Sequence, residues 1–467
     1  MVSCFIEKDK KTPIYKQLYD FYREEMLNGN MKEGTKLPSV RSLSQSLGIS
    51  KNTVNEAYQQ LAAEGYIESR VRQGYWVVHN LEFLSHFKQK EITEVVRDKP
   101  AAERLAIDFQ YGDIDLEHFP MKIWKKCLQD CLEIKDNKEI LLYGNKLGSI
   151  PLRKQIAAYL YRSRGIHCGY EDIVITAGTN QLIRTILSLF GNEKSAVAME
   201  NPGYDGVKHA VLREGYKILD IKVTEENGYD VQALKNSGCK AAYITPSHQF
   251  PLGIIMPVAK RLELLKWAEE ANAYIIEDDY DSEFRYEGAP VASLKGLDRH
   301  DRVIYAGTFS KSFLPSIRIS YMVLPKDLMD RLNKGFIDSQ NASSIFQHAL
   351  ALFMENEHFD RHLRKMRKIY KEKHEILLLS LHKHMGKDIN IIGEKAGLHL
   401  LINVSNKDHS KLIKTAANQS IGIYSTASYY SDKSVDECPI ILGFGGLTVH
   451  EVEDGIKKLA AIWFEQG

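Results

Sequence analysis

Short apolar runs, each followed by a polar turn, recur from residue 106 onward and limit what this chain can fold into. Four of these segments read DIVITAGTNQLIRTILSLF, SAVAMENPGYDGVKHAVLREGY, AAYITPSHQFPLG and AYIIEDDYDSEF. Strands that alternate with helices predict an α/β fold built on a mostly parallel sheet. Because ligands of such sheets bind outside the carboxyl ends of the strands, the polar residues of these turns are the first candidates for a site.

Composition narrows the class of protein. The chain has 467 residues, of which 44% are hydrophobic and 26% charged, as in a globular protein with a large core. Its net charge of +1 excludes a global field that attracts nucleic acid or membrane, so any basic surface must be local. No apolar run is long enough for a bilayer, the N-terminus lacks a signal-peptide core, and the six cysteines form no CxxC pair. We therefore expect a cytoplasmic protein without membrane contact.

The first eighty residues carry a different pattern. Apolar residues at helical spacing predict one helix that ends near Gly29 and two shorter helices after it. Ser39 and Ser50 are suited to cap the shorter helices, and Gly48 to join them in a tight turn. The following stretch, YIESRVRQGYWVV, predicts a small hairpin. This order of elements indicates a helix-turn-helix followed by a wing.

Polar and basic residues gather where such a module meets DNA. Lysine and arginine neutralise phosphates, and asparagine can bond to adenine in the major groove. Residues 1–80 hold eleven basic and nine acidic residues, so charge alone is a weak signal, and a small helical module with ordinary solvated charges is the alternative. The candidate DNA-binding residues are Arg41, Lys51, Asn52, Thr53, Asn55, Arg70 and Arg72.

The stretch LPSVRSLSQSLGISKNTVNEAYQQLAAEGYIES resembles the winged helix-turn-helix of the GntR regulator family, and the resemblance extends over about residues 12–79. It implies that double-stranded operator DNA is the partner. Asn55 stands where many members carry a further arginine, which bears on the operator sequence. Residues 81–105 are charged and lack a clean periodicity, so we interpret them as a linker between domains at 1–80 and 106–467.

The polar turns of the larger region suit a phosphorylated, charged aromatic ring. Gly178 and Thr179 open a helix whose backbone amides can hold a phosphate. Asp278 closes a strand and can pair with a ring nitrogen. In GTFSKSFLPSIRISYMVLP, the amine of Lys311 is a candidate nucleophile and Arg318 a candidate phosphate clamp.

Each of these signals also has a plainer explanation. An aspartate after a strand is usually a helix cap, and a lysine in a turn is usually solvated. Tyr204 could stack on a ring and Tyr280 could donate to a ring hydroxyl, yet tyrosines at such places mostly pack. The joint occurrence of the signals, in order and at strand ends, favours a ligand site.

ENPGY, PSHQFPLG, IIEDDYDSEF and GTFSKSFLPSIRISYMVLP resemble the fold-type I, class I aminotransferases, over about residues 106–467. The resemblance implies that pyridoxal 5'-phosphate is the cofactor and that Lys311 forms its Schiff base. It further implies that Asp278 lies at the pyridinium nitrogen and Tyr280 near the ring hydroxyl, with Tyr204 beside the ring. The residues implied around the phosphate are Gly178, Thr179, Thr308, Ser310 and Arg318.

Three positions depart from the aminotransferase pattern. Phe250 stands where an asparagine is usual, and Asp281 where many members have the tyrosine of the ring hydroxyl, so that Tyr280 is displaced by one residue. Ile441 occupies the approximate place of the arginine that grips a substrate carboxylate. These departures spare cofactor binding but disfavour efficient transamination.

A GntR-type reader followed by an aminotransferase-like region is similar to the MocR/GabR regulators. The segment YGNKLGSIPLRKQIAAYL resembles the one whose tyrosine reaches the cofactor phosphate of a partner subunit, which implies a homodimer and a role for Tyr143. A metal site is not expected: His358 and His362 are four residues apart, but no glutamate completes an HExxH motif, and a solvated helix face is the better interpretation.

Our first hypothesis is a DNA-binding transcriptional regulator whose cofactor-bearing domain senses an amine, an amino acid or vitamin B6. The second is an active aminotransferase with an ancillary DNA-binding module, against which Ile441 argues. The third is a vitamin B6 sensor with no amine ligand. The sequence leaves the effector, the operator and the choice between activation and repression open.

Overall fold

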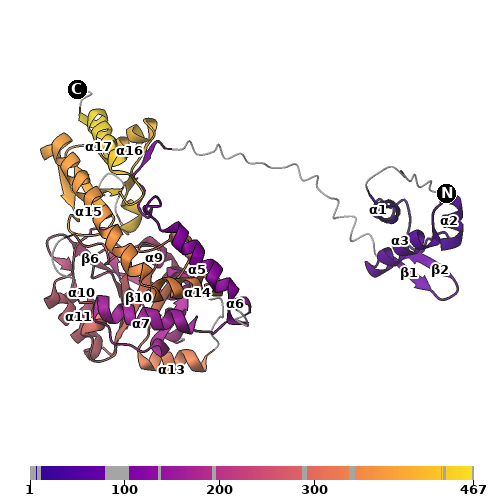
Figure 1. Cartoon of the computed structure of the whole chain (residues 1–467), viewed down its shortest axis with the longest axis horizontal. Helices are drawn as coiled ribbons and strands as arrows, with labels where there is room; N and C mark the ends of the chain where they lie inside the picture. Colours follow the sequence, from indigo (N-terminus) through magenta and orange to yellow (C-terminus); the bar gives the residue numbers. More distant parts are fainter. Residues whose placement is uncertain are drawn as a thin grey trace. The chain divides into compact units, whose positions relative to one another are not determined.

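The computed structural model divides the chain into two compact units, Met1–Ala102 and Glu103–Gly467 (Figure 1). The predicted linker at 81–105, except its last residue, and Tyr143 lie outside the residues that the structure describes. The described residues are 7, 12–78, 105–134, 138–142, 144–191, 196–286, 292–335, 342–432, 434 and 438–464.

The N-terminal unit contains three helices and a hairpin. Its elements are α1 (Ile14–Leu27), α2 (Val40–Leu47), α3 (Lys51–Ala63), β1 (Ile67–Arg70) and β2 (Gly74–Val77). Ser39 caps α2 by accepting a hydrogen bond from the backbone N–H of Ser42 at 3.1 Å, and Ser50 caps α3 through Thr53 at 3.1 Å. Gly48 follows α2 in the left-handed conformation, with φ 62°, as the tight turn requires. The predicted helix-turn-helix and hairpin are confirmed.

Helix α3 holds this unit together. Its residues Val54, Ala57, Tyr58 and Leu61 are each 0% exposed, and they pack with residues of α1, α2 and the hairpin. The buried stripe leaves the other side of α3, including the exposed Lys51 at its first turn, open to solvent.

An eight-stranded sheet forms the centre of the larger unit (Figure 1). In sheet order, its strands are β4 (Ile173–Thr176), β11 (Ser320–Val323), β10 (Val303–Thr308), β9 (Tyr274–Asp279), β8 (Ala241–Ile244), β5 (Ala196–Asn201), β6 (Lys217–Thr224) and β7 (Gly228–Tyr229). The strands from β10 to β6 are parallel, whereas β11 is antiparallel to both of its neighbours and β7 to β6. The predicted mostly parallel sheet is confirmed.

Helices cover both faces of this sheet. They are α5 (Met121–Glu133), α6 (Lys138–Leu141), α7 (Ile150–Arg164), α8 (Thr179–Leu189), α9 (Asp205–Arg213), α10 (Val231–Asn236), α11 (Val258–Glu270), α12 (Leu294–Leu297), α13 (Lys326–Lys334) and α14 (Ser344–Glu355). Alternate residues of β4 enter different parts of the core. Val174 packs in the cluster that contains α8, α9 and α13, while Ile173 and Ile175 pack in the cluster of α5, α7 and α14.

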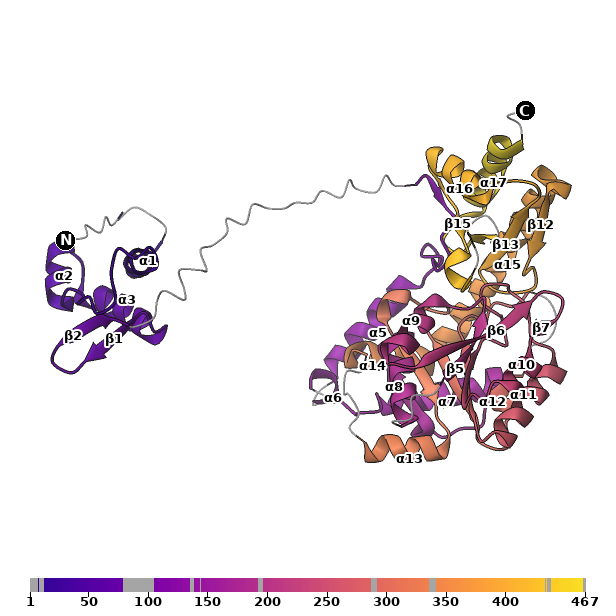
Figure 2. The same ribbon diagram turned by 180° about the vertical axis from the view of Figure 1, so that it is seen from behind.

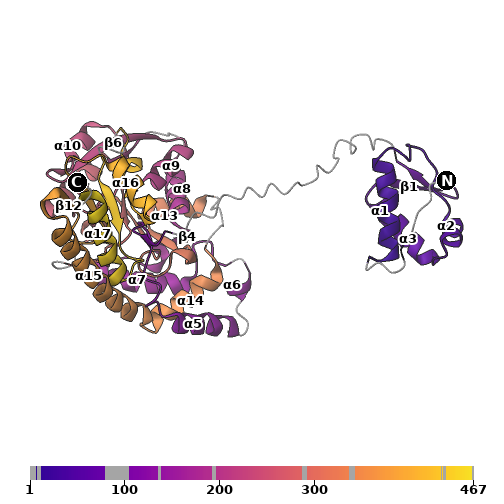
Figure 3. The same ribbon diagram turned by 90° about the horizontal axis from the view of Figure 1, so that it is seen from above.

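A smaller sheet lies at one end of this unit (Figure 2). Its strands, in order, are β12 (Ile389–Ile392), β13 (His399–Val404), β16 (Ile440–Gly443) and β15 (Tyr424–Ser425). The helices packed with it are α15 (His358–His384), α16 (His409–Asn418) and α17 (Val449–Phe464), and α15 contacts α17 (Figure 3). A separate pair joins β3 (Ile107–Asp108) to β14 (Ile421–Gly422), so the start of this unit is tied to its C-terminal part.

The histidine pair on α15 corrects one prediction. The sequence favoured a solvated helix face, but His362 is 7% exposed, with its ring 5.7 Å from that of Phe119 and 6.1 Å from that of Phe313. Burial lowers the pKa of His362 to about 4. The spacing predicts both histidines on one side of a helix, but only the tertiary contacts show that His362 is buried while His358 stays partly exposed.

None of the described helices, including the long α15, has both the length and the apolar composition that crossing a membrane requires.

Candidate functional site

A cavity of about 250 Å³ lies at the carboxyl ends of β8, β9 and β10. The predicted residues that line it are Thr179, Tyr204, Asp278, Tyr280, Thr308, Ser310, Lys311 and Arg318. Residues that line it but were not among the predicted site residues are Tyr111, Gly112, Asn180, Tyr243, Thr245, Phe250 and Pro315. Of these, Asn180, Tyr243 and Thr245 belong to strand-end motifs already visible in the sequence, whereas Tyr111 and Gly112 carried no such signal.

Lys311 lies in the turn between β10 and β11, half-buried against an aromatic face. Its Nζ is 4.3 Å from the centroid of the Tyr111 ring, and a Cβ at Gly112 would lie 3.3 Å from that Nζ. Loss of water around the ammonium lowers the pKa of Lys311 to about 8, although Asp281 and Asp113 oppose the shift. Near neutral pH, an appreciable fraction of this amine is therefore unprotonated and nucleophilic.

A positively charged corner forms where Arg318 meets the N-terminus of α8. Gly178 precedes α8 with φ 93°, and a Cβ added there would lie 2.3 Å from Arg318 Nη2. The guanidinium therefore rests against bare backbone at the positive end of a helix, and this arrangement favours an anion. Thr308 and Ser310 add hydroxyl groups to the same cavity, with Thr308 Oγ1 donating to Ser310 Oγ at 3.0 Å.

Asp278 supplies a buried carboxyl group at the end of β9. It is 7% exposed and accepts a hydrogen bond from the hydroxyl of Tyr243. Burial raises the pKa of Asp278 to about 7; the Tyr243 bond opposes this shift, and Asp279 and Asp281 reinforce it. A cationic N–H donor in the cavity would stabilise the ionised carboxylate, so this group suits a protonated ring nitrogen.

Aromatic side chains form one wall of the cavity. Tyr204 and Phe250 meet edge to face, with ring centroids 5.7 Å apart. Phe250 is 2% exposed and also packs on Tyr111 and Tyr429, with centroid distances of 4.9 and 4.7 Å. The position where an asparagine was expected from the aminotransferase pattern is thus apolar and offers no hydrogen bond from its side chain.

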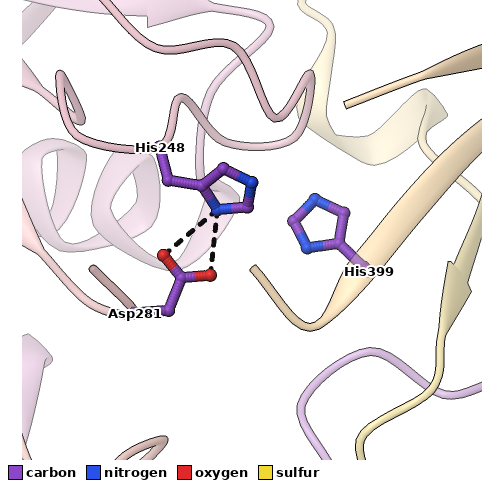
Figure 4. A group of neighbouring side chains, drawn as sticks. All are labelled: His248, Asp281 and His399. Atoms are coloured by element: carbon purple, nitrogen blue, oxygen red, sulfur yellow. Dashed lines mark hydrogen bonds and ion pairs between the residues drawn. The ribbon is translucent and has the colours of Figure 1, made fainter. Parts of the chain in front are cut away.

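Three buried polar side chains lie close together near the cavity, namely His248, Asp281 and His399 (Figure 4), and His248 contacts the hydroxyl of Tyr280. The Asp281 oxygens are 2.9 and 3.1 Å from His248 Nδ1, and His399 Nε2 donates to the Pro251 carbonyl oxygen at 2.9 Å. Burial lowers the pKa of His399 to about 3, so its ring is neutral near physiological pH. These residues come from distant parts of the sequence, and no motif pointed to them as a group.

Ile441 does not face the cavity. It lies in β16, is 1% exposed, and packs in the core with residues of the central sheet. An arginine that clamps a substrate carboxylate would therefore have to come from the residues that line the cavity. Among the described residues that line it, Arg318 is the one arginine, and it lies at the positive corner beside Gly178.

The predicted DNA-binding residues occupy α2, α3 and the hairpin. Arg41, Lys51 and Asn52 are exposed near the first turns of α2 and α3, and Thr53 and Asn55 are partly exposed on α3. Two arginines belong to the hairpin. Arg70 Nε donates to Glu68 Oε1 at 2.7 Å and its guanidinium lies 4.9 Å from the Trp76 ring, whereas Arg72 lies at the tip with φ 60°.

Two family models match the chain in the order that the fold indicates. Residues 14–77 match "Bacterial regulatory proteins, gntR family", and residues 106–435 match "Aminotransferase class I and II". The predicted fold class, an aminotransferase-like α/β domain after a helix-turn-helix domain, is confirmed.

Curated relatives share this organisation over almost their whole length. An uncharacterized HTH-type transcriptional regulator, YdeL of Bacillus subtilis, is 40% identical over 99% of both chains. The probable rhizopine catabolism regulatory protein MocR of Rhizobium meliloti is 31% identical, over 97% of this chain and 94% of the relative. The HTH-type pyridoxine biosynthesis transcriptional regulator PdxR of Corynebacterium glutamicum is 29% identical, over 93% and 92%.

Solved structures match the larger unit. An archaeal alanine:glyoxylate aminotransferase is 27% identical, with a TM-score of 0.70 over 77% of this chain and 91% of that chain. A Pyrococcus horikoshii kynurenine aminotransferase, solved in complex with PMP, is 26% identical with a TM-score of 0.67, over 77% and 91%.

Proposed function

Because the chain belongs to the family of HTH-type transcriptional regulators in which a GntR domain precedes a class I and II aminotransferase domain, we propose that its cavity holds pyridoxal 5'-phosphate and controls DNA binding. The observation that carries this proposal is the joint placement of Lys311, Asp278 and the Gly178–Arg318 corner around one cavity.

The residues fit the cofactor at three points. The Gly178–Arg318 corner, where any larger residue than glycine would collide with the guanidinium, suits the phosphate. Asp278, held close to its protonation midpoint by burial, suits the ring nitrogen. Lys311, with its lowered pKa, suits the aldehyde. When bound, the cofactor supplies an aldehyde carbon that can exchange between Lys311 and an incoming primary amine.

The effector is proposed by its chemistry. Relatives carry names that refer to rhizopine catabolism and to pyridoxine biosynthesis, so their names do not agree on one compound. An amine or amino acid would compete with Lys311 for the cofactor, and vitamin B6 itself would fill the same cavity. Binding of either compound would change the contacts of cavity residues at the ends of β9 and β10. The protein with the compound bound would then differ from the protein without it, and this difference can alter DNA affinity.

DNA contact is proposed for the exposed start of α3 and its neighbours. Arg41 and Lys51 would neutralise phosphates, and Asn52, Thr53 and Asn55 would face the bases. Arg72, at the hairpin tip, is better placed for the DNA backbone than Arg70, because Arg70 is already held by Glu68 and Trp76.

A homodimer is proposed from the apolar surface around α5 and α6. Leu132, Ile134, Leu141 and Leu142 are 56%, 46%, 77% and 65% exposed, and both helices pack on α14. Exposed leucines and isoleucines in this number suit a protein partner. A second copy of the chain would also explain how Tyr143, next to this surface in the sequence, could serve a cofactor site.

Chemical trapping tests the cofactor proposal. The purified chain, loaded with pyridoxal phosphate, should absorb in the visible range, and reduction with borohydride should leave the pyridoxyl mass on Lys311. The Lys311→Ala variant should remain folded and take up no label at that position. Label on another lysine, or no label after loading, would refute the assignment.

An active aminotransferase is the second candidate, favoured by the similarity to solved aminotransferases. Transamination requires the substrate carboxylate to be held so that its Cα–H bond aligns with the ring, usually by a bidentate arginine. Arg318 is committed to the phosphate corner, so we predict product formation about 10- to 100-fold below ordinary enzyme rates. Single-turnover assays with a panel of amino acids measure product formation, and steady-state assays measure sustained turnover. Sustained turnover at the typical enzyme rate of about 10 per second or faster would favour the enzyme.

A further inference from the structure

Tyr280 lies between the cavity and a buried, hydrogen-bonded pair of side chains, His248 and Asp281. Its side chain lines the cavity, and its hydroxyl oxygen is 2.9 Å from His248 Nδ1. The same Nδ1 is 2.9 Å from one Asp281 oxygen and 3.1 Å from the other (Figure 4). His248 and Asp281 are each 2% exposed, so water does not compete for these contacts.

His248 Nδ1 can carry only one proton, and this limit fixes which atom donates in its contacts with Asp281 and Tyr280. An imidazole nitrogen holds either one proton or one lone pair, and a carboxylate only accepts. The proximity of both Asp281 oxygens therefore places the proton on Nδ1, which leaves Nδ1 no lone pair for the Tyr280 hydroxyl. The Tyr280 oxygen can only share the Nδ1 proton with Asp281, as a second acceptor. The Tyr280 proton is then left free to point elsewhere, and the cavity is the open side.

The other edge of His248 agrees with this assignment. His248 Nε2 is buried and has no hydrogen-bond partner in the described structure, so a proton there would have no acceptor. Gly397 packs directly on the ring, since a Cβ at that residue would lie 2.0 Å from His248 Cε1. The imidazole is thus locked by packing on one edge and by Asp281 on the other.

We propose that His248, fixed by Asp281, is a positioning residue that holds the Tyr280 oxygen and directs the Tyr280 proton toward an oxygen substituent of the ring bound in the cavity. The inference rests on the proposed cofactor and assigns a role to His248 and Asp281, which are not among the residues that line the cavity. Burial, followed by the charge of Asp281, raises the pKa of Tyr280 well above 10, so the hydroxyl keeps its proton. The other ionisable groups that act on Tyr280 are Tyr111, Asp278 and Glu200.

The test is a pH titration of the visible absorbance of the cofactor-loaded full chain. A donor to the ring oxygen stabilises the form with more negative charge on that oxygen. Losing the donor in Tyr280→Phe should therefore move the midpoint to higher pH, by about one unit. His248→Gln should move it in the same direction, and the double variant should move no further than Tyr280→Phe alone.

Two further variants separate positioning from simple structural damage. His248→Asn places an amide N–H near the position of Nδ1 and should restore most of the wild-type midpoint. His399→Gln is the matched control: it is equally buried and can still donate to the Pro251 carbonyl, but it does not contact the Tyr280 hydroxyl, so its midpoint should stay at the wild-type value. Thermal melting and circular dichroism establish that each variant folds.

Affinity for 4'-deoxypyridoxine phosphate, which has no aldehyde, provides a readout independent of Lys311. By calorimetry, Tyr280→Phe and His248→Gln should each weaken it about tenfold, and His248→Asn should not. If wild-type chain binds no pyridoxal phosphate, the proposed function fails. If wild-type binds and Tyr280→Phe shifts the midpoint while His248→Gln does not, or if the two shifts add in the double variant, only the positioning role is overturned.

Discussion

At the scale of single residues, the surroundings of Lys311 set the pH range in which the cavity can react. Burial lowers the pKa of its ammonium from 10.5 to about 8. Below that pH the unprotonated fraction rises about tenfold per pH unit, and above it the fraction levels off. We therefore predict that the rate at which the cofactor-free chain captures pyridoxal phosphate rises up to about pH 8 and then becomes constant. Stopped-flow absorbance measures this rate; a rise that continues to pH 10 would indicate an ordinary, solvated lysine.

Gly178 gives a second test at this scale. Its alanine variant would place a Cβ 2.3 Å from Arg318 Nη2 and must displace the guanidinium. Loss of one charge-assisted contact with the phosphate should weaken cofactor affinity about 10- to 100-fold. Gly165→Ala is the matched control, because Gly165 also has a positive φ, 67°, but has nothing within 4 Å of the added Cβ. Gly165→Ala should lose about 1–2 kcal/mol of stability, because Gly165 lies in the left-handed helical region. Gly178→Ala should lose about 1–3 kcal/mol, because φ 93° with ψ 169° is a conformation that essentially only glycine adopts. Only Gly178→Ala should lose cofactor affinity. Equal affinities in the two variants would argue against a phosphate at this corner.

At this scale, the sequence predicts the site residues that stand next to a strand end. Lys311, Asp278 and Arg318 each stand beside a strand end, and an α/β pattern brings strand ends to one edge. His248 and His399 gave no such signal, because their proximity to Asp281 depends on how distant segments fold together. The sequence places Ile441 only by its approximate position in a motif, whereas the register of β16 and the burial of Ile441 show that its side chain lies in the core.

At the scale of elements, capping and turn residues explain why the sequence predicts the helix-turn-helix correctly. Ser39, Gly48 and Ser50 mark helix ends through their own backbone and side-chain chemistry, which needs no tertiary information. Local signals of this kind do not predict which side of α15 is buried. His358 and His362 are four residues apart, but the burial of His362 depends on Phe119 and Phe313 from distant parts of the chain.

Helices α2 and α3 carry a prediction about salt dependence. Arg41→Ala and Lys51→Ala should each weaken binding to all DNA sequences and reduce the slope of log K against log salt by about 0.9 per lost phosphate contact. Lys16→Ala is the control, since Lys16 is exposed on α1, outside the predicted contact residues. Fluorescence anisotropy at several salt concentrations measures the slopes. Slopes that are the same in all three variants as in the wild type would show that another surface contacts the phosphates.

At the scale of the whole molecule, two units of different architecture share one chain, and our proposal requires that the state of the cavity in one changes DNA binding by the other. The order of the two units was predictable because each has its own local pattern: helical caps and a hairpin in one, and alternating strands and helices in the other. The proposed coupling between the units has no sequence motif, because coupling depends on a difference in free energy between two states.

The most direct measurement of the central claim is the DNA affinity of the full chain in three states of the cavity. An operator is first selected from a random DNA library with the cofactor-loaded protein. Anisotropy titrations then compare cofactor-free protein, loaded protein, and loaded protein with members of an amine panel, alongside Lys311→Ala. We predict that the wild-type affinity differs at least about fivefold between two of these states, while Lys311→Ala still binds the operator but does not respond to amines. The same wild-type affinity in every state, across the panel, would contradict the claim that the cavity controls DNA binding.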